Sequence, residues 1–249
     1  MSQKHSCLNC ATVFEGKYCP NCGQSASTHR IDWHVILHDL QHFFHLENAL
    51  FYTARELLLR PGVTIRNYTL GKHKRYFGPL STLLTVAGMY ILLYQLSQID
   101  PLNIMAQMIY ALDEVFYNGQ LFVPDWIADN YAFVELFLFL PMFSVASYLS
   151  FYRAKYNFLE HFAINAYLSA QRMLIGVLTF PILYLFKGDS LSGIVEIVIS
   201  FLELAFTVWA YLSFFTQFKI LPRLGLIALT FLIVFVELSL FMLVSDYLL

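Results

Sequence analysis

Long apolar runs separated by short polar stretches dominate the chain after residue 76. A helix needs about 20 mostly apolar residues to cross the roughly 30 Å hydrocarbon layer of a bilayer. Backbone N–H and C=O groups need internal partners in hydrocarbon, and the alternating pattern of barrel strands is absent, so these runs predict helices. Five segments qualify as spans: residues 77–97, 131–152, 162–186, 192–217 and 224–248.

The composition supports this interpretation. Of the 249 residues, 58% are apolar and only 13% are charged, which is about half the charged share of a soluble domain. The predicted fold is therefore an all-α polytopic membrane protein with about five transmembrane helices. We predict three regions: a small N-terminal ribbon over 1–28, amphipathic interfacial helices and a basic collar over 29–76, and a transmembrane helical bundle over 77–249.

Residues 31–46 have the apolar period of an amphipathic helix, with Asp32 as the expected N-cap. One face of this helix carries four histidines: His34, His38, His42 and His45. Imidazoles four residues apart can chelate a metal, but histidine is also an ordinary polar residue on a wet face. No glutamate stands at catalytic spacing, which favours the second interpretation. A further helix is predicted over 47–60, ending at Pro61, and a second short helix over 63–70.

Lysine and arginine are distributed unevenly: nine of the 15 lie in the first 75 residues. Residues 98–130, between the first two spans, contain none and carry five acidic residues. The loops expected on the opposite side hold the cations Lys72, Lys74, Arg75, Arg153, Lys155, Lys219 and Arg223. Because short cytoplasmic loops are enriched in lysine and arginine, five passes with a cytoplasmic N-terminus and a periplasmic C-terminus are predicted.

All four cysteines of the chain form a C-x2-C-x8-C-x2-C pattern: Cys7, Cys10, Cys19 and Cys22. Each CxxC turn directs two thiolates at one point, and two such turns supply the tetrahedral four-sulfur set that suits zinc. Pro20 presets the second turn and Gly23 permits a positive φ, whereas Ala11 stands where glycine is expected and weakens the first turn. Four protein ligands leave no open position, so a structural Zn²⁺ ion is predicted.

Two disulfides or a redox-active CxxC pair are the alternatives. Disulfides do not persist in the cytoplasm, and a thioredoxin-like motif needs a βαβ context that about 25 residues cannot supply. Phe14 and Tyr18 are expected to pack beside the metal. The nearby cations are only Lys4, Lys17 and Arg30, a poor footprint for phosphate, so a protein partner is expected rather than nucleic acid.

Three ionisable residues fall near the middle of predicted spans: Arg172, Glu203 and Glu237. An unpaired charge there costs about 2.5–3.5 kcal/mol, so these side chains should face the bundle interior and pair. Counted from the loops, Arg172 and Glu203 reach similar depth, which predicts an Arg172–Glu203 pair with Glu237 close by and Glu135 nearer the outer surface. A pair that fixes helix register and a polar pathway for a proton, ion or lipid headgroup are both compatible with this pattern.

Basic and aromatic residues precede the first span, and the cations of this collar are Arg60, Arg66, Lys72, Lys74 and Arg75. Each cation attracts anionic lipid by about 1 kcal/mol. The collar is therefore expected to anchor the chain on membrane lipid, with specific recognition of a lipid headgroup as the sharper alternative.

Three motifs carry a family resemblance: CxxC-x8-CxxCGQ over 7–24, LLLRPG over 57–62, and RxYxxGKxxRYxxPL over 66–80. They resemble a bacterial inner-membrane family of unknown function, in which an N-terminal four-cysteine zinc ribbon precedes a multi-span helical domain. The resemblance covers about the first 95 residues. It implies the inner (cytoplasmic) membrane of a two-membrane bacterium and supplies no activity. His73 stands where the family pattern leads us to expect an arginine.

No nucleotide-binding loop, HExxH zinc motif or serine nucleophile elbow is present, so no catalytic residue is assigned and no enzyme is predicted. We predict a scaffold or accessory subunit that docks a cytoplasmic or membrane partner, or a second copy of itself. The alternative is a transporter or lipid-handling protein that uses the intramembrane arginine and glutamates. A lipid-directed enzyme using an acid–histidine pair such as Glu160-His161 is the third hypothesis.

Overall fold

The computed structural model describes residues 4–26, 31–33, 35–36, 48–97, 131–187 and 191–248. Five of its helical segments are long and apolar enough to cross a membrane: Pro79–Ser97, Ala132–Ser150, Phe158–Leu185, Ser192–Phe214 and Ile220–Phe241. The predicted fold class is thereby confirmed, and each candidate span overlaps one of the five predicted from the sequence.

The described elements comprise a hairpin, two short helices and the five spans. The N-terminal hairpin consists of β1 (Lys4–Ser6) and β2 (Val13–Glu15). Two short helices precede the bundle, α2 (Asn48–Leu59) and α3 (Pro61–Thr69). The spans are α4 (Pro79–Ser97), the series α7 (Tyr131–Val134), η1 (Glu135–Phe139) and α8 (Leu140–Ser150), then α9 (Phe158–Leu185), α10 (Ser192–Phe214) and α11 (Ile220–Leu248).

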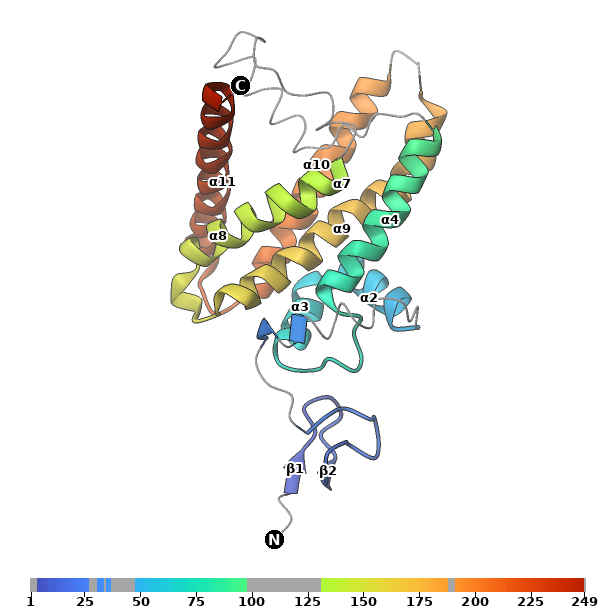
Figure 1. The fold of residues 1–249 in the computed structure, drawn as a ribbon, viewed down its shortest axis with the longest axis vertical. Coiled ribbons are helices and arrows are strands. Elements are labelled where there is room, and N and C mark those ends of the chain that lie inside the picture. Colours follow the sequence, from blue (N-terminus) through green and yellow to red (C-terminus); the bar gives the residue numbers. More distant parts are fainter. Residues whose placement is uncertain are drawn as a thin grey trace.

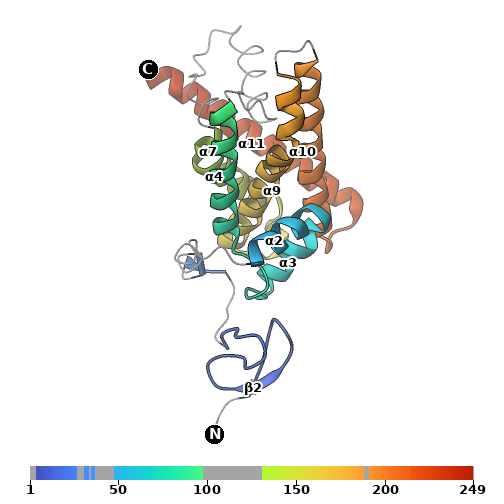
Figure 2. The ribbon, with the colours of Figure 1, turned by 90° about the vertical axis from the view of Figure 1, so that its right-hand side faces the viewer.

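The spans pack around α9, with α4 running parallel to it and α8 and α10 running antiparallel (Figures 1 and 2). Helix α9 contacts α4, α8 and α10, while α11 lies against α8 and α10. Figure 1 shows the β1–β2 hairpin, α3 and the α8–α9 turn at one end of the molecule. The C-terminus lies at the other end, so successive spans run in alternating directions.

The second span contains a π-helical turn, η1, between α7 and α8. The Leu140 N–H donates to the Glu135 carbonyl, five residues back, instead of four. Pro141 follows directly, and because proline has no N–H it cannot continue the α-helical bonding pattern. Pro181 lies inside α9 without ending that helix. The interruption near Pro141 therefore takes the form of a wide turn in the second span.

Two helices begin earlier than predicted. Helix α9 begins at Phe158 instead of 162, because Asn157 and Glu160 form a reciprocal capping box with N–H···O distances of 2.8 and 2.7 Å. Helix α3 begins at Pro61, where the missing proline N–H costs nothing in the first helical turn. Near the N-terminal region, the Val35 N–H donates to the Asp32 carboxylate at 3.0 Å, which confirms the predicted N-cap.

Helix α3 docks onto the C-terminal end of α10. The Arg66 guanidinium donates to the carbonyl oxygens of Ser213, at 2.8 Å, and Phe214. The Gly62 N–H donates to the Ser213 hydroxyl at 3.1 Å, and a Cβ atom on Gly62 would overlap the Ser213 backbone. Glycine is therefore required here by close approach of two helices, a role that the breaker pattern alone did not indicate.

A second arginine binds the same helix end. The Arg223 guanidinium donates to the carbonyl oxygens of Leu212 and Phe218, the latter at 2.5 Å. The last carbonyls of a helix have no partner within the helix and carry the negative end of its dipole. Arg66 and Arg223 together satisfy three consecutive carbonyls of α10, those of residues 212–214.

Buried side chains also tie the segment before the first span to α9. The Gln171 amide donates to the Leu57 carbonyl at 2.7 Å, and the Tyr167 hydroxyl donates to the Phe77 carbonyl at 2.5 Å. Tyr167 and Leu57 are fully buried in one apolar cluster with the aromatic residues at the ends of α8 and α10. The amphipathic segment over 48–78 is thus an integral part of the bundle.

Candidate metal centre and intramembrane charges

The N-terminal ribbon, defined here as residues 4–26, presents its cysteines on two matching turns. In the first turn, the Cys7 N–H donates to the Thr12 carbonyl at 2.9 Å and the Ala11 N–H donates to the Cys7 carbonyl at 2.8 Å. The second turn repeats both bonds at 2.8 Å among Cys19, Gly23 and Gln24. Strands β1 and β2 pair antiparallel and bring the two turns together.

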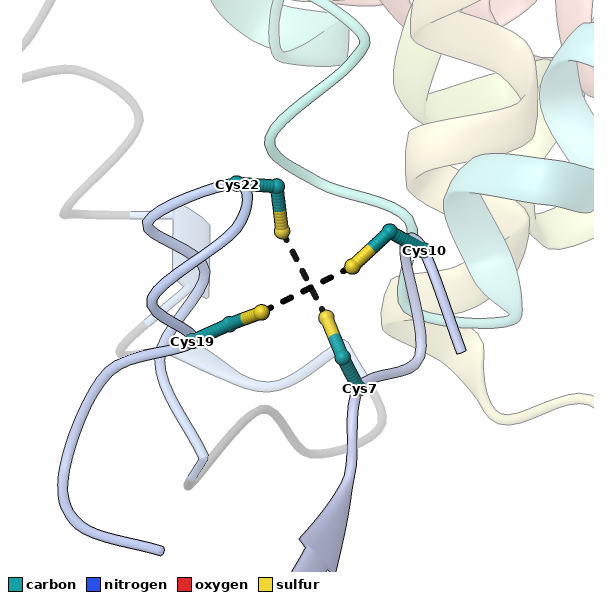
Figure 3. Close-up of side chains that lie close together, drawn as sticks. All are labelled: Cys7, Cys10, Cys19 and Cys22. Carbon is teal, nitrogen blue, oxygen red and sulfur yellow. Dashed lines mark hydrogen bonds between the residues drawn. The ribbon is translucent and has the colours of Figure 1, made fainter. Parts of the chain in front are cut away.

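The four sulfur atoms converge on one point (Figure 3). Cys7 Sγ lies 3.5 Å from Cys22 Sγ, and Cys10 Sγ lies 3.6 Å from Cys19 Sγ. All four ligand atoms fall within 4.8 Å of one another. A tetrahedral site with metal–sulfur bonds of about 2.3 Å has edges of about 3.8 Å, whereas a disulfide requires about 2.05 Å. The cysteines are free thiols arranged so that they can hold a metal ion.

The local environments give the Cys7 and Cys10 thiols different pKa values. Burial raises the pKa of the Cys7 thiol to about 11. Hydrogen bonding with the side chain and backbone of Thr12 lowers the pKa of the half-buried Cys10 thiol to about 6. The lowered pKa favours the thiolate form of Cys10, which is the form that binds metals.

The two turns differ in one strained residue. Ala11 has φ +59° and Gly23 has φ +73° at equivalent positions, and the left-handed region costs a residue with a Cβ about 1 kcal/mol. We expect Ala11→Gly to strengthen metal binding about fivefold, measured by competition with a chromophoric chelator on the full-length protein. Gly23→Ala should weaken binding to a similar degree. Equal metal affinities for the wild type and the two variants would contradict backbone strain at Ala11.

Gln24, directly after the second turn, fastens the ribbon to the collar. Its buried side-chain amide donates to the Gly71 carbonyl at 2.7 Å, and its amide oxygen accepts from the Lys74 N–H at 3.3 Å. The Lys72 ammonium donates to Asn67 at 3.0 Å, which steadies the same loop. Gln24, which in the sequence only belongs to the CxxCGQ motif, thus joins the ribbon to the 71–74 loop.

One of the two aromatic residues expected to pack beside the metal site does not do so. Phe14 is buried against Cys7 and Cys19, as expected, but Tyr18 is 66% exposed. The backbone of Tyr18 forms an isolated bridge with Ser25, which turns its ring outward from the sulfur cluster. A ribbon this small has room beside its metal site for one aromatic ring.

Two further collar cations have partners within the chain. One guanidinium nitrogen of Arg60 donates to both carboxylate oxygens of Glu56, at 2.8 and 2.7 Å, while the Arg60 side chain is 60% exposed. The Arg75 guanidinium lies over the Tyr52 ring at 4.8 Å. Recognition of a lipid headgroup by the collar stays a prediction.

The predicted Arg172–Glu203 ion pair is wrong, because Arg172 pairs with a different glutamate. The Arg172 guanidinium forms an ion pair with Glu135 in η1 and also donates to the Ser169 hydroxyl at 3.0 Å. Glu203 lies within electrostatic reach of both charges. Among the described residues, no hydrogen bond or ion pair joins Glu237 to this group. Counting from the loops gives a depth along each span but does not give the rotation of each helix about its own axis.

A second buried polar group lies between α8, α9 and α10. The Asn165 amide donates to the Ser147 hydroxyl at 2.9 Å, and the Tyr211 hydroxyl donates to the Asn165 amide oxygen at 2.6 Å. His161 Nδ1 lies 3.0 Å from the Ser147 hydroxyl. Glu160 instead caps α9, so Glu160 and His161 serve different parts of the fold. Scattered polar residues in apolar runs were the only sequence signal for this network.

The histidine face lies outside the described residues: His34, His38, His42 and His45. Residues 98–130, between the first two spans, lie outside them as well. Metal binding by the histidines therefore stays a prediction. Within the described ranges, the four cysteines form the one cluster of potential metal ligands.

A family described as Protein of unknown function (DUF3667) matches residues 47–91. The match covers α2, α3 and most of α4, the segment that docks onto α9 and α10. The ribbon and the four later spans lie outside it. No curated protein and no solved structure matches the chain.

Proposed function

We propose that this protein is a membrane scaffold, in which a zinc-loaded ribbon is held on a five-helix bundle as a docking module for a protein partner. The observation that carries the proposal is the attachment of the ribbon through Gln24, whose amide binds both Gly71 and Lys74. A ribbon fixed in this way presents one defined surface at the membrane. A ribbon on a loose tether would present none.

The chemistry of the site supports zinc as the resident metal. Four thiolates in a closed set suit Zn²⁺, which has no preference for a fifth ligand in structural sites. Sulfur–sulfur distances of 3.5 and 3.6 Å require little adjustment to reach tetrahedral geometry. Because no position is left open, the metal would supply folding energy and rigidity.

The placement of cations supports a cytoplasmic ribbon. The collar and the loops after α8 and α10 lie at the ribbon end of the bundle (Figure 1). They carry Lys72, Lys74, Arg75, Arg153, Lys155, Lys219 and Arg223, whereas the described part of the opposite end carries Lys187. Positive charge on short loops marks the cytoplasmic side. Together with the family resemblance, this favours the bacterial inner membrane.

The surface chemistry of the ribbon favours a protein with apolar side chains as the partner. Leu8, Val13 and Tyr18 are each more than half exposed. The charged residues of the ribbon are Lys4, Glu15 and Lys17, a nearly balanced set. Nucleic acid would require a concentrated basic surface, and exposed apolar groups on a small rigid module are typical of protein contacts.

Co-purification from native membranes in mild detergent tests the proposal. We expect Cys19→Ser/Cys22→Ser to lose the stoichiometric partner seen with the wild type. Gln24→Ala should leave metal content unchanged but expose the 71–74 loop, since losing the Gln24 hydrogen bonds costs about 1–3 kcal/mol. Tryptic cleavage at Lys72 and Lys74 should then accelerate about tenfold, and partner recovery should fall.

Ser6→Ala is the matched control, because Ser6 is exposed on β1 and lies outside both cysteine turns. It should leave cleavage and partner recovery unchanged. A partner that survives loss of both cysteines would contradict the scaffold. In that case the transporter or lipid-handling alternative, favoured by the buried charges around Arg172, would take its place.

A further inference from the structure

The carboxylate of Glu203 is buried in the middle of a membrane span without a direct cationic partner. Glu203 lies near the centre of α10 and is 4% exposed. Its Oε2 atom has no hydrogen-bond partner among the described residues. The Ser200 hydroxyl, one helical turn away on the same face, is 2% exposed and also has no partner there. Two unsatisfied polar atoms thus lie on one buried face of α10.

The charges around Glu203 do not balance. Helix α9 contributes Arg172, η1 contributes Glu135, and Tyr94 of α4 lies within electrostatic reach. Arg172 is engaged by Glu135 and Ser169. No charged group of α11 or α3 forms an ion pair with Glu203 within the described ranges. One guanidinium therefore faces two carboxyl groups, and all three side chains are buried.

An unbalanced carboxylate in hydrocarbon is costly, and the usual remedy is to bind a positive charge. A metal cation needs several oxygen ligands, while this face of α10 offers one carboxyl group and one hydroxyl. A proton needs a single oxygen. The geometry therefore favours a proton over a metal cation.

We propose that Glu203 is a proton-binding site inside the bundle, where the proton supplies the positive charge that Arg172 cannot give to two carboxylates. Glu135 keeps the arginine, and Glu203 holds the proton on one carboxyl oxygen. This inference does not rest on the partner proposed for the ribbon, and either can fail without the other.

Infrared difference spectroscopy on the full-length protein, exchanged between H2O and D2O in lipid nanodiscs, tests the site. We expect the wild type to show the C=O band of a protonated carboxylic acid at neutral pH. Glu203→Gln should abolish that band, because the amide mimics the neutral acid. Glu203→Gln should also keep the wild-type elution profile on gel filtration, since it removes no charge from the protonated state.

Glu135→Gln tests whether the charge balance around Arg172, and not burial alone, keeps Glu203 protonated. With Glu135 neutral, Arg172 has one carboxylate left to pair with, so Glu203 should ionise and its acid band should be lost. The matched control is Glu196→Gln, two turns earlier on α10 and half-buried, which should leave the Glu203 band unchanged.

Three results would overturn the proposal. The first is a wild-type spectrum without an acid band that depends on Glu203. The second is a Glu203 band that persists in Glu135→Gln, which would show that the arginine does not decide where the proton sits. The third is loss of the band on adding sodium at constant pH, which would make the ligand a metal cation.

Discussion

Removal of the metal proposed for the four-cysteine cluster should unfold the ribbon and leave the bundle folded. A segment of 23 residues, 4–26, buries only Cys7, Cys19, Phe14 and Gln24, far too little apolar surface to fold alone. Binding of a structural zinc ion contributes about 10–16 kcal/mol in peptides of this size. Chelation, or Cys19→Ser/Cys22→Ser, should therefore abolish amide protection over 4–26 in hydrogen exchange, while protection in α9 and α10 stays unchanged.

Elemental analysis of the same preparations checks the metal itself. The wild type should carry one zinc per chain and the double variant none. Ser6→Ala is a suitable control, because Ser6 is exposed on β1 and outside both cysteine turns. Stoichiometric iron in place of zinc, or a chelated ribbon that keeps its amide protection, would contradict the assignment.

Loss of the arginine in the bundle should be the most damaging single substitution among the charged residues. Arg172 is 3% exposed and Glu135 is fully buried, so Arg172→Met leaves a carboxylate with no counter-charge. Breaking a buried pair from one side costs about 3–5 kcal/mol, whereas replacing both partners with apolar residues is often neutral. Thermal unfolding in detergent should show a large loss for Arg172→Met and recovery of most of it in Arg172→Met/Glu135→Leu.

Arg60→Met is the matched comparison. Arg60 also forms an ion pair with a glutamate, Glu56, but its side chain is 60% exposed. Exposed pairs of this kind contribute less than about 1 kcal/mol. Equal losses for Arg60→Met and Arg172→Met, or a double variant no more stable than Arg172→Met, would show that the buried pair is not what stabilises the bundle.

The sequence by itself determined the features that depend on local pattern. The five spans follow from the length and apolarity of continuous runs. The metal site follows from cysteine spacing, because each CxxC turn folds by its own backbone bonds. Asp32 as an N-cap and Ala11 as a strained turn residue were also readable, since both depend on a few neighbouring residues.

Helix ends were predicted less well, because local bonds outside the apolar run set them. The capping box of Asn157 and Glu160 lengthens α9 into a segment that reads as loop. Pro61, read as a stop, opens α3. In both cases hydropathy indicates which residues can lie in the membrane, whereas backbone hydrogen bonds determine the residue at which the helix begins.

Only the tertiary structure decided which distant groups meet. Arg172 binds Glu135, which lies in the π-turn of the second span. Pro141 signals an interruption of that span but not the direction in which the Glu135 carboxylate points. Arg66, predicted to face lipid headgroups, reaches the end of α10. Gln24 reaches a loop 47 residues away. These contacts depend on how helices rotate and pack against one another, which hydropathy and spacing do not encode.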